Sequence, residues 1–373
     1  MSSQAKKVFV AMSGGVDSSV AALLLKEKGY DVTGVHMLCW EDCANNQDKQ
    51  DAMRVAAKLG IPFLVWGFKK EYRETVFNYM VREYAAGRTP NPDVMCNKEI
   101  KFGIFLKRAL EADADFIATG HYVRKFEIQN PKSEKRGDNS FPQPPPLTLR
   151  GGGEGGGVTL FCAKDFNKDQ SYFLWTLTQD QLKCSLFPIG DYLKSEVREM
   201  ANKAGLLTAA KKDSQGLCFV GKVDFGEFIK KILPKKSGAV LAADGKKIGE
   251  HDGAHFYTIG QRHGLNLGGL PKPVFVARKD ALTNTLVVAQ GQNDPILYKK
   301  ELLAENFNWV AGIPTMPFPC QARIRYRQPL QACRISGDMV TFDQHQRAVA
   351  SGQSVVFYKE DGEMLGGAII GAS

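Results

Sequence analysis

A run of small and hydroxyl-bearing residues near the N-terminus has the composition of an anion-binding turn. Residues 13–19 read Ser-Gly-Gly-Val-Asp-Ser-Ser, between an apolar run at 8–12 and a helical pattern at 20–26. These flanks predict a buried strand before the turn and a helix after it. Glycines let the backbone approach an anion, and free N–H groups at the helix start point toward it. Ser18 and Ser19 add hydroxyl donors, whereas Asp17 would repel a bare phosphate and suits a link through Mg²⁺ or water.

Two alternatives to this kind of turn fit the residues less well. The P-loop of the common NTPases ends in Gly-Lys-Ser or Gly-Lys-Thr, which is absent at residues 13–19. An ordinary strand-to-helix turn with a serine cap is simpler, but it does not account for two glycines, Asp17 and two serines together. A second near-match, Gly216 to Val223, has a valine where a Mg²⁺-binding hydroxyl is needed, and no clear strand precedes it. We therefore place the phosphate-binding turn at residues 13–19.

Cys96 lies in a segment, Asn-Pro-Asp-Val-Met-Cys-Asn-Lys at residues 91–98, between two predicted helices. The prolines at positions 90 and 92 predict a fixed loop, with Cys96 just before a helix. The helix dipole and Lys98 favour the thiolate there, which matters because a free thiol of pKa about 8.5 is mostly protonated at neutral pH. Asp93 could move a proton. Spacing alone leaves open a bystander cysteine in a capping loop.

Three arginines alternate along a predicted strand at positions 323, 325 and 327. A period of two places their guanidinium groups on one face, with Ile324 and Tyr326 on the other. Such a stripe suits phosphate groups of a nucleic acid. The alternative is a solvated face of a barrel.

His36, Cys39 and Cys43 have a spacing that suggests a metal site. Only three ligands are present and no fourth lies nearby, so a zinc site is disfavoured and we expect no metal. A loop with two incidental thiols is the preferred interpretation, and a labile iron–sulfur cluster stays an open alternative.

Residues up to about 123 alternate between strand and helix patterns, which predicts a doubly wound parallel sheet of the α/β class. The predicted strands cover residues 8–12, 31–37, 63–66 and 116–119, and the predicted helices cover 20–26, 48–59, 70–88 and 98–111. Ligands of such sheets bind at the carboxyl ends of the strands. Ser13, Met37 and Gly120 lie at predicted strand ends, so we expect them to share a nucleotide pocket.

The remaining chain divides into segments that differ in composition and predicted secondary structure. Proline and glycine runs predict a flexible surface insertion at 130–157. Helical patterns follow at 171–182, 195–204 and 225–233, and short strands dominate from residue 274, with a hairpin signal at Asp361-Gly362. We therefore expect a catalytic domain at 1–212, a small mixed linker domain at 213–283 and a C-terminal β-barrel at 284–373.

Composition agrees with a soluble, multidomain protein. The chain has 373 residues, 43% hydrophobic and 24% charged, and no apolar run of membrane-spanning length. The first strand pattern begins so early that no signal or transit peptide is expected, which favours the cytoplasm. The net charge of +9 favours a polyanionic partner, although a basic enzyme would show it too. Eight scattered cysteines argue against a structural disulfide framework.

Six motifs complete a family resemblance. They are Ser-Gly-Gly-Val-Asp-Ser-Ser, Asn-Pro-Asp-x-x-Cys-Asn-Lys, Ala-Thr-Gly-His-Tyr, Asn-Lys-Asp-Gln-Ser-Tyr-Phe-Leu, Asp-Ser-Gln-Gly-x-Cys-Phe-Val-Gly and Thr-Ile-Gly-Gln-Arg-His-Gly-Leu, starting at residues 13, 91, 118, 167, 213 and 258. The first alone resembles the N-type ATP pyrophosphatases, which cleave ATP to AMP and pyrophosphate. The set, spread in order over essentially the whole chain, resembles the tRNA-specific 2-thiouridylase family.

The resemblance implies sulfuration at C2 of the wobble uridine in tRNAs for Lys, Glu and Gln, with ATP and Mg²⁺. It implies a sulfur-donor relay protein or a cysteine desulfurase as a partner. Residues implied for ATP are Ala11, Met12, Ser13, Gly14, Gly15, Val16, Asp17, Ser18, Met37 and Gly120. Residues implied for the target base are Asn91, Pro92 and Asp93. Residues implied for tRNA are His121, Lys168, Asp169, Gln170, Arg325, Tyr326 and Gln353.

In the same resemblance Cys96 is the nucleophile and Cys218 carries the persulfide, and the two form a disulfide when sulfur is released. We expect both cysteines in exposed loops, where replacement by serine costs little stability. We also expect the Cys218 loop to change conformation when tRNA binds. The long insertion at 130–157 departs from the family pattern.

Two rival functions remain at this point. An amide-forming ligase could use the same ATP turn, but it has no need of a thiol pair. An RNA-binding protein with a vestigial ATP turn would show no tRNA-dependent release of pyrophosphate.

Overall fold

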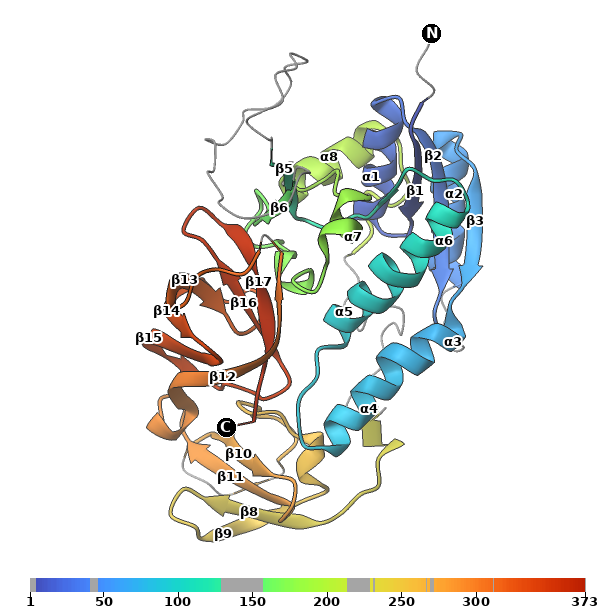
Figure 1. Cartoon of the computed structure of the whole chain (residues 1–373). Helices are drawn as coiled ribbons and strands as arrows, with labels where there is room; N and C mark the ends of the chain where they lie inside the picture. The colour runs from blue at the N-terminus through green and yellow to red at the C-terminus, as the bar shows by residue number, and fades with distance from the viewer. Residues whose placement is uncertain are drawn as a thin grey trace.

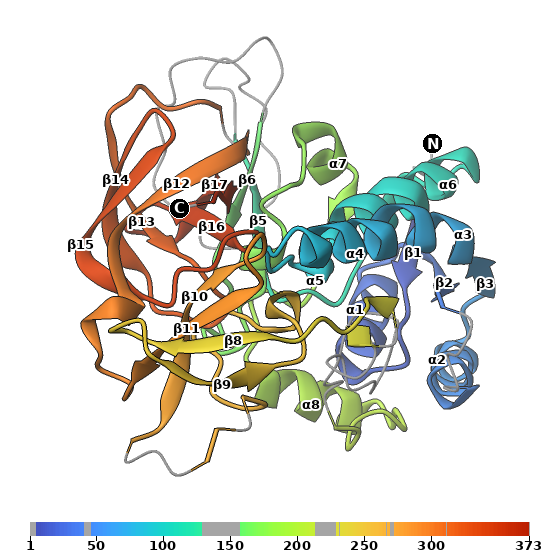
Figure 2. The same cartoon turned by 90° about the horizontal axis from the view of Figure 1, so that it is seen from below.

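The computed structural model describes residues 5–40, 46–128, 157–212, 229–230, 232–265, 267–268, 272–310 and 312–372. Its strands form three sheets, of five, four and eight strands. Figure 1 shows the five-stranded unit beside the eight-stranded one, with the four-stranded sheet below both, and Figure 2 shows the same arrangement from below. Among the described residues, no helix has the length and apolar character needed to cross a membrane.

The first sheet is parallel throughout, in the order β3-β2-β1-β4-β7. Its strands are β1 (Lys7–Ala11), β2 (Asp31–Leu38), β3 (Phe63–Gly67), β4 (Phe116–Ala118) and β7 (Ser185–Leu186). Helices α1 (Val16–Glu27), α2 (Asn46–Leu59) and α8 (Lys194–Lys203) follow in the same unit. The predicted α/β class is confirmed.

Both faces of β1, in the middle of this sheet, are buried, as expected for parallel strands joined by helices, whereas the edge strand β3 is partly exposed. On one face, Val8 and Val10 of β1 share an apolar cluster with residues of α1, α2 and α8. On the other face, Phe9 and Ala11 share a cluster with residues of the helical segments between 69 and 111. That second cluster also takes in Tyr358 and other barrel residues, so the core continues from the sheet into the barrel.

Two long helical runs cover the second face. The first joins α3 (Lys69–Tyr72), a π-helical stretch (Arg73–Phe77) and α4 (Asn78–Ala85). The second joins α5 (Pro92–Met95), a π-helical stretch (Cys96–Ile104) and α6 (Phe105–Glu111). The loop expected at residues 91–98 is therefore wrong. Asn91 caps the helix, its side chain accepting from the Val94 N–H at 3.2 Å, and Pro92 takes the first helical position, where proline is favoured.

The helix expected at 171–182 is also wrong. A 3₁₀ turn (Ser171–Phe173) comes first, and α7 (Gln179–Lys183) starts anew at Thr178, whose capping box with Gln181 fixes the start. Leu174, Trp175 and Leu177 lie between them and are buried. Packing of this apolar segment in the core overrides its helical pattern.

The four-stranded sheet is mixed and has the order β10-β11-β8-β9. Its strands are β8 (Gly238–Ala242), β9 (Lys247–His251), β10 (Val274–Asp280) and β11 (Thr285–Gln290). The β8–β11 pair is parallel and the others are antiparallel. The expected boundary at 283/284 falls at the turn between β10 and β11. Of the helix expected at 225–233, residues 225–228 and 231 lie outside the described residues, and 229, 230 and 232 are helical.

The third sheet closes into a six-stranded antiparallel barrel, because β12 pairs with both β15 and β17. The barrel strands are β12 (Tyr298–Trp309), β13 (Phe318–Arg323), β14 (Gln331–Ser336), β15 (Met339–Arg347), β16 (Ser354–Tyr358) and β17 (Glu363–Ile370). The predicted hairpin at Asp361-Gly362 joins β16 to β17, with Gly362 at φ +85°. Strands β5 (Arg124–Glu127) and β6 (Val158–Phe161) extend the sheet from β17, so chain from the first unit is built into the barrel sheet.

Candidate functional site

The turn after β1 is shaped by its glycines and closed by its serines. Gly14 has φ +78°, and a Cβ there would lie 2.1 Å from the Asp48 carbonyl oxygen. The Ser18 hydroxyl lies 3.2 Å from the Ser13 N–H and 3.2 Å from the Gly15 carbonyl oxygen. The Ser19 hydroxyl donates to the same Gly15 oxygen at 2.8 Å. The turn is thus held in one conformation at the start of α1, as an anion site requires.

Gly120 and Met37 reach the same edge of the sheet as this turn. A Cβ at Gly120 would lie 2.6 Å from the Ser18 nitrogen and 2.7 Å from the Asp17 carbonyl carbon, so the strand end after β4 packs directly on the start of α1. Met37 lies near the end of β2, beyond Val35, which pairs with Ala11. The Met37 side chain is buried in the apolar cluster. The three strand ends therefore meet as the sequence predicts.

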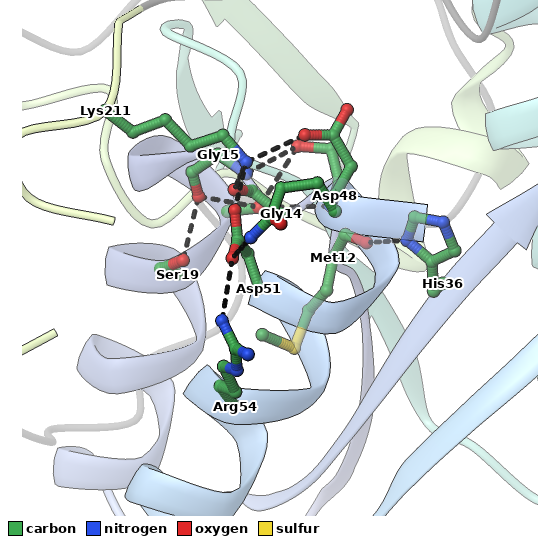
Figure 3. A network of polar contacts seen from close by, with 12 residues as sticks. Met12, Gly14, Gly15, Ser19, His36, Asp48, Asp51, Arg54 and Lys211 are labelled. Carbon is green, nitrogen blue, oxygen red and sulfur yellow. Dashed lines mark hydrogen bonds and ion pairs between the residues drawn. The ribbon is translucent and has the colours of Figure 1, made fainter. Parts of the chain in front are cut away.

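Lys211 joins the turn to α2 (Figure 3). Its ammonium donates to the Gly14 carbonyl oxygen at 2.9 Å, to Asp48 Oδ1 at 2.7 Å and to Asp51 Oδ2 at 2.5 Å. Partial burial lowers the pKa of Lys211, but its hydrogen bonds to the two aspartates raise that pKa by more. The net shift is upward, so the ammonium stays charged. This positive charge therefore lies against the backbone of the glycine turn.

A second lysine holds Asp17. Lys194 Nζ lies 2.8 and 2.9 Å from the two carboxylate oxygens of Asp17, and the Tyr122 hydroxyl donates to the same carboxylate at 2.8 Å. Lys194 also begins α8, and its N–H donates to Asp165 at 3.0 Å. Sequence reasoning missed both Lys194 and Lys211. The signal available for Lys211 was its place two residues before the motif that starts at Asp213.

Cys96 lies on the same side of the sheet as Ala11 and Met37. Its thiol is fully buried and belongs to the apolar cluster that contains those two residues. The expectation of an exposed loop is therefore wrong for Cys96, because the Asn91-Pro92 cap carries the helix past this position. Cys218 lies outside the described residues.

A residue of the barrel forms hydrogen bonds to the chain just before the helix that carries Cys96. Gln353 Nε2 donates to the carbonyl oxygens of Thr89 and Pro90, both at 3.0 Å. One turn into the helix, Asn97 Nδ2 donates to the Phe173 carbonyl oxygen at 3.2 Å. Asn91, Pro92 and Asp93 are half-buried. These contacts place the Asn-Pro-Asp turn at the junction between the first unit and the barrel.

Models of known families and curated relatives match the whole length of this arrangement. Residues 6–222 match the family model "tRNA methyl transferase HUP domain", 226–290 the "PRC-barrel domain" of the same name, and 299–370 the "Aminomethyltransferase beta-barrel domain". A tRNA-specific 2-thiouridylase of Francisella tularensis subsp. novicida is 47% identical over 381 aligned positions, covering 98% of this chain and 99% of that protein. The chain belongs to the tRNA-specific 2-thiouridylase family.

A second relative agrees, and a solved structure adds nothing. The 2-thiouridylase of Francisella tularensis subsp. holarctica is 46% identical, again over 98% of this chain and 99% of that one. A solved U34-tRNA thiolase of Methanococcus maripaludis is 18% identical and covers 61% of this chain and 64% of its own, with a TM-score of 0.35. That likeness is too low to carry an argument.

The residues that the family resemblance implies for tRNA divide into an interior and a surface group. His121 is buried between Phe102 and Phe187, and its Nδ1 lies 2.8 Å from the Thr119 hydroxyl. Burial, followed by the charge of Lys101, lowers the pKa of His121 well below its usual value, so the ring is neutral. Asp169 is also buried. Lys168, Gln170, Tyr326 and Gln353 are half-buried and Arg325 is exposed.

The expected arginine stripe is wrong. Strand β13 ends at Arg323, and Arg327 has φ +63°, so the alternation needed for one common face is lost. Arg323 is buried and forms an ion pair with Asp169. Arg325 is exposed and donates to the Arg347 carbonyl oxygen at 2.9 Å, while Tyr326 packs on Phe173 with ring centres 4.7 Å apart.

The possible metal site near His36 receives no support from the part of the chain that the structure describes. His36 Nδ1 lies 2.9 Å from the Met12 carbonyl oxygen. Cys39 is buried, and Cys43 lies outside the described residues. Within the described ranges, no group of three His, Cys, Asp or Glu side chains is placed to hold a metal ion.

We expect Gly14→Ala to destabilise the protein by more than ~2 kcal/mol, since a new Cβ would overlap the Asp48 carbonyl and force α2 away from the turn. Gly29→Ala is the matched control: Gly29 has φ +81° but open space around its Cβ, so it should cost only the ~1 kcal/mol of left-handed strain. Urea unfolding of both variants measures the difference. Equal losses would mean that Gly14 does not pack against α2.

Proposed function

We propose that this protein is an ATP-dependent tRNA uridine 2-sulfurtransferase that replaces the C2 oxygen of the wobble uridine by sulfur. The observation that carries the proposal is the 47% identity to a tRNA-specific 2-thiouridylase over nearly the full length of both chains. The glycine turn at the carboxyl edge of a parallel sheet and a cysteine on the same side of that sheet support the same chemistry.

The reaction needs activation because the C2 oxygen of uridine is a poor leaving group. Attack of this oxygen on the α-phosphate of ATP adenylates it and releases pyrophosphate, which the N–H groups of the turn at 13–19 suit. The terminal sulfur of a Cys218 persulfide then attacks C2, and AMP leaves with the original oxygen. Cys96 attacks the Cys218 sulfur and releases thiouridine, which leaves a disulfide that an external thiol reduces.

Two lysines at the turn are paired with carboxylates: Lys194 with Asp17 of the turn itself, and Lys211 with Asp48 and Asp51 of α2. Mg²⁺ usually binds one or two carboxylates together with substrate phosphates. Asp17, the carboxylate within residues 13–19, fits that role with Lys194 beside it, so Mg²⁺ would enter with the triphosphate and neutralise its charge. Lys194 and Lys211 would then lie next to the phosphates and stabilise negative charge as pyrophosphate forms.

Burial of Cys96 gives the reaction a conformational requirement. A fully buried thiol cannot meet a flipped-out uridine or a second cysteine without movement of the residues that cover it. Gln353 hydrogen-bonds the barrel to the backbone of Thr89 and Pro90, just before this helix. A shift of the barrel on tRNA docking would therefore move the start of the helix. We keep the prediction that the Cys218 segment also moves on tRNA binding.

The remaining expectations are proposals that accompany the proposed reaction. They are the three-domain division at 1–212, 213–283 and 284–373, substrate tRNAs for Lys, Glu and Gln, a sulfur-donor relay protein or cysteine desulfurase, and action in the cytoplasm. The roles of Asn91, Pro92 and Asp93 at the target base agree with their position beside Gln353, at the junction of the two larger units.

The deciding experiment is mass analysis of tRNA nucleosides after incubation of the protein with unmodified tRNA, ATP and a persulfide source. The expected product is 2-thiouridine, with one pyrophosphate released per sulfur inserted. A methylated nucleoside would instead favour the methyl transfer after which the family models are named. Pyrophosphate release that depends on ammonia rather than sulfur would favour an amide-forming ligase, and tRNA binding without turnover would favour a binding protein.

Arg325→Ala should weaken tRNA binding and lower the slope of log affinity against log salt by about 1, the value for one lost phosphate contact. Arg334→Ala, which removes an exposed arginine from the neighbouring strand β14, is the control and should leave the slope unchanged. Filter binding of tRNA over a series of salt concentrations measures both. An unchanged slope for Arg325→Ala would contradict a phosphate contact.

A further inference from the structure

Two cysteines of the barrel face one another across neighbouring strands. Cys320 of β13 and Cys333 of β14 are direct partners in the antiparallel register. Their sulfur atoms lie 3.5 Å apart. Both side chains pack against the barrel core, Cys333 as a buried member and Cys320 at its edge. The proposed sulfur transfer uses neither of them.

The backbone at this position already suits a disulfide. Directly opposed residues of antiparallel strands have Cα atoms about 4.5 or 5.5 Å apart, depending on the hydrogen-bonding position. Disulfides span Cα separations of roughly 4.4 to 6.8 Å. The two thiols can therefore bond by rotation of their side chains, with both strands kept in place.

The two thiols differ in access to solvent. Cys320 is half-buried, whereas Cys333 is only 5% exposed. The contact with Cys320, followed by burial, raises the pKa of Cys333, so its thiol holds its proton. An oxidant in solution thus reacts with Cys320 first, and the buried Cys333 serves as the resolving thiol.

We propose that Cys320 and Cys333 form a dithiol site that reacts with low-molecular-weight disulfides of the glutathione type. The Cys320 thiolate attacks one sulfur of the small disulfide, which forms a mixed disulfide and releases one small thiolate. Cys333 then attacks the Cys320 sulfur, its proton passes to the small thiolate, and the second small thiolate leaves. Two protein thiols are oxidised to a disulfide while the small disulfide is reduced to two thiols.

This bond would close the neck of the β13–β14 hairpin. The hairpin carries Arg325 and Tyr326 between its strands, and Arg323 ends β13. Oxidation would covalently link β13 and β14, the two strands that flank Arg325 and Tyr326. The dithiol site itself does not depend on the proposed tRNA function.

The test is to equilibrate the full-length protein in mixtures of oxidised and reduced glutathione, quench with acid, alkylate, and map peptides without reduction. We expect a Cys320–Cys333 cross-linked peptide that grows with the fraction of oxidised glutathione and disappears in reduced glutathione. Cys184, another half-buried cysteine, is the internal control for general thiol reactivity. Full alkylation of both Cys320 and Cys333 in oxidised glutathione alone would overturn the proposal.

A variant separates the two roles. In Cys333→Ala, the mixed disulfide on Cys320 has no resolving thiol, so glutathione attached to Cys320 should rise at least tenfold over the unsubstituted protein. In the unsubstituted protein the mixed disulfide should be transient. Stable glutathione on Cys320 while Cys333 is alkylated would show that Cys333 does not resolve it and would also overturn the proposal, whether or not the variant folds.

Discussion

Cys96→Ala is expected to reduce tRNA thiolation by at least ~1,000-fold, the order of loss when a catalytic nucleophile is removed. In the proposed reaction no other group on this helix can break the bond between Cys218 and the transferred sulfur. Loading of Cys218 and a single release of pyrophosphate should persist, because both precede the step that needs Cys96. Labelled persulfide sulfur, followed on the protein and on tRNA, measures each stage.

Alanine is the better replacement for this position than serine. Because Cys96 is fully buried in an apolar cluster, a serine there would bring a more strongly hydrated hydroxyl out of water, which costs stability, contrary to the expectation of a tolerated change in an exposed loop. Alanine removes the sulfur without adding a polar atom. A loss of activity in Cys96→Ala can then be assigned to chemistry once the unfolding midpoint has been compared with that of the parent protein.

Cys39→Ala is the matched control. Cys39 is a second buried thiol in the same apolar cluster, with 1% exposure, and should leave thiolation close to the parent rate. If both variants lose activity equally, a role of Cys39 in a metal or cluster site becomes the better interpretation. If Cys96→Ala keeps full activity, the thiol relay is wrong and free sulfide becomes the candidate donor.

Local sequence patterns were sufficient to predict individual strands, helices and turns. Alternation of apolar strands with helices predicts the parallel sheet, and it places the turn at 13–19, Met37 and Gly120 at one edge, as the structure shows. The closed barrel follows from short strands and a hairpin signal, and the structure confirms both. The individual strands and the hairpin depend on residues within a few positions of each other, whereas closure of the barrel depends on the pairing of β12 with the distant strand β17.

Features that depend on distant partners could not be predicted. The Asn-Pro-Asp segment reads as a fixed loop although Asn91 and Pro92 are local signals of a helix start, whereas the burial of Cys96 depends on a cluster with residues far away in the chain, such as Ala11 and Met37. In the sequence, Arg323 is one of an alternating set. Its partner Asp169 lies 154 positions earlier, and no local period reveals which arginine meets a buried carboxylate.

Breaking this buried pair should have the largest effect on stability. We expect Arg323→Met to lower the free energy of unfolding by ~3–5 kcal/mol, since it leaves the Asp169 carboxylate buried without its cation. Arg323 also donates to the Ser171 hydroxyl at 3.1 Å and to the Tyr358 hydroxyl at 2.9 Å, so three groups lose a donor together. Arg334→Met, an exposed arginine on the neighbouring strand, should change stability by no more than ~0.5 kcal/mol.

A double-mutant cycle shows whether the loss comes from the stranded charge. Asp169 accepts from the N–H groups of Ala163 and Ser171 at 3.0 and 3.2 Å, and an asparagine oxygen can keep both bonds. Arg323→Met combined with Asp169→Asn should therefore be more stable than Arg323→Met alone, although it lacks one more charge. If the double variant is less stable by the sum of the two single losses, Arg323 contributes by packing against Tyr358 instead. If it recovers, the pair ties β13 of the barrel to the 163–171 segment of the first unit by charge, and weakening it should loosen the grip of the barrel on the helix that carries Cys96.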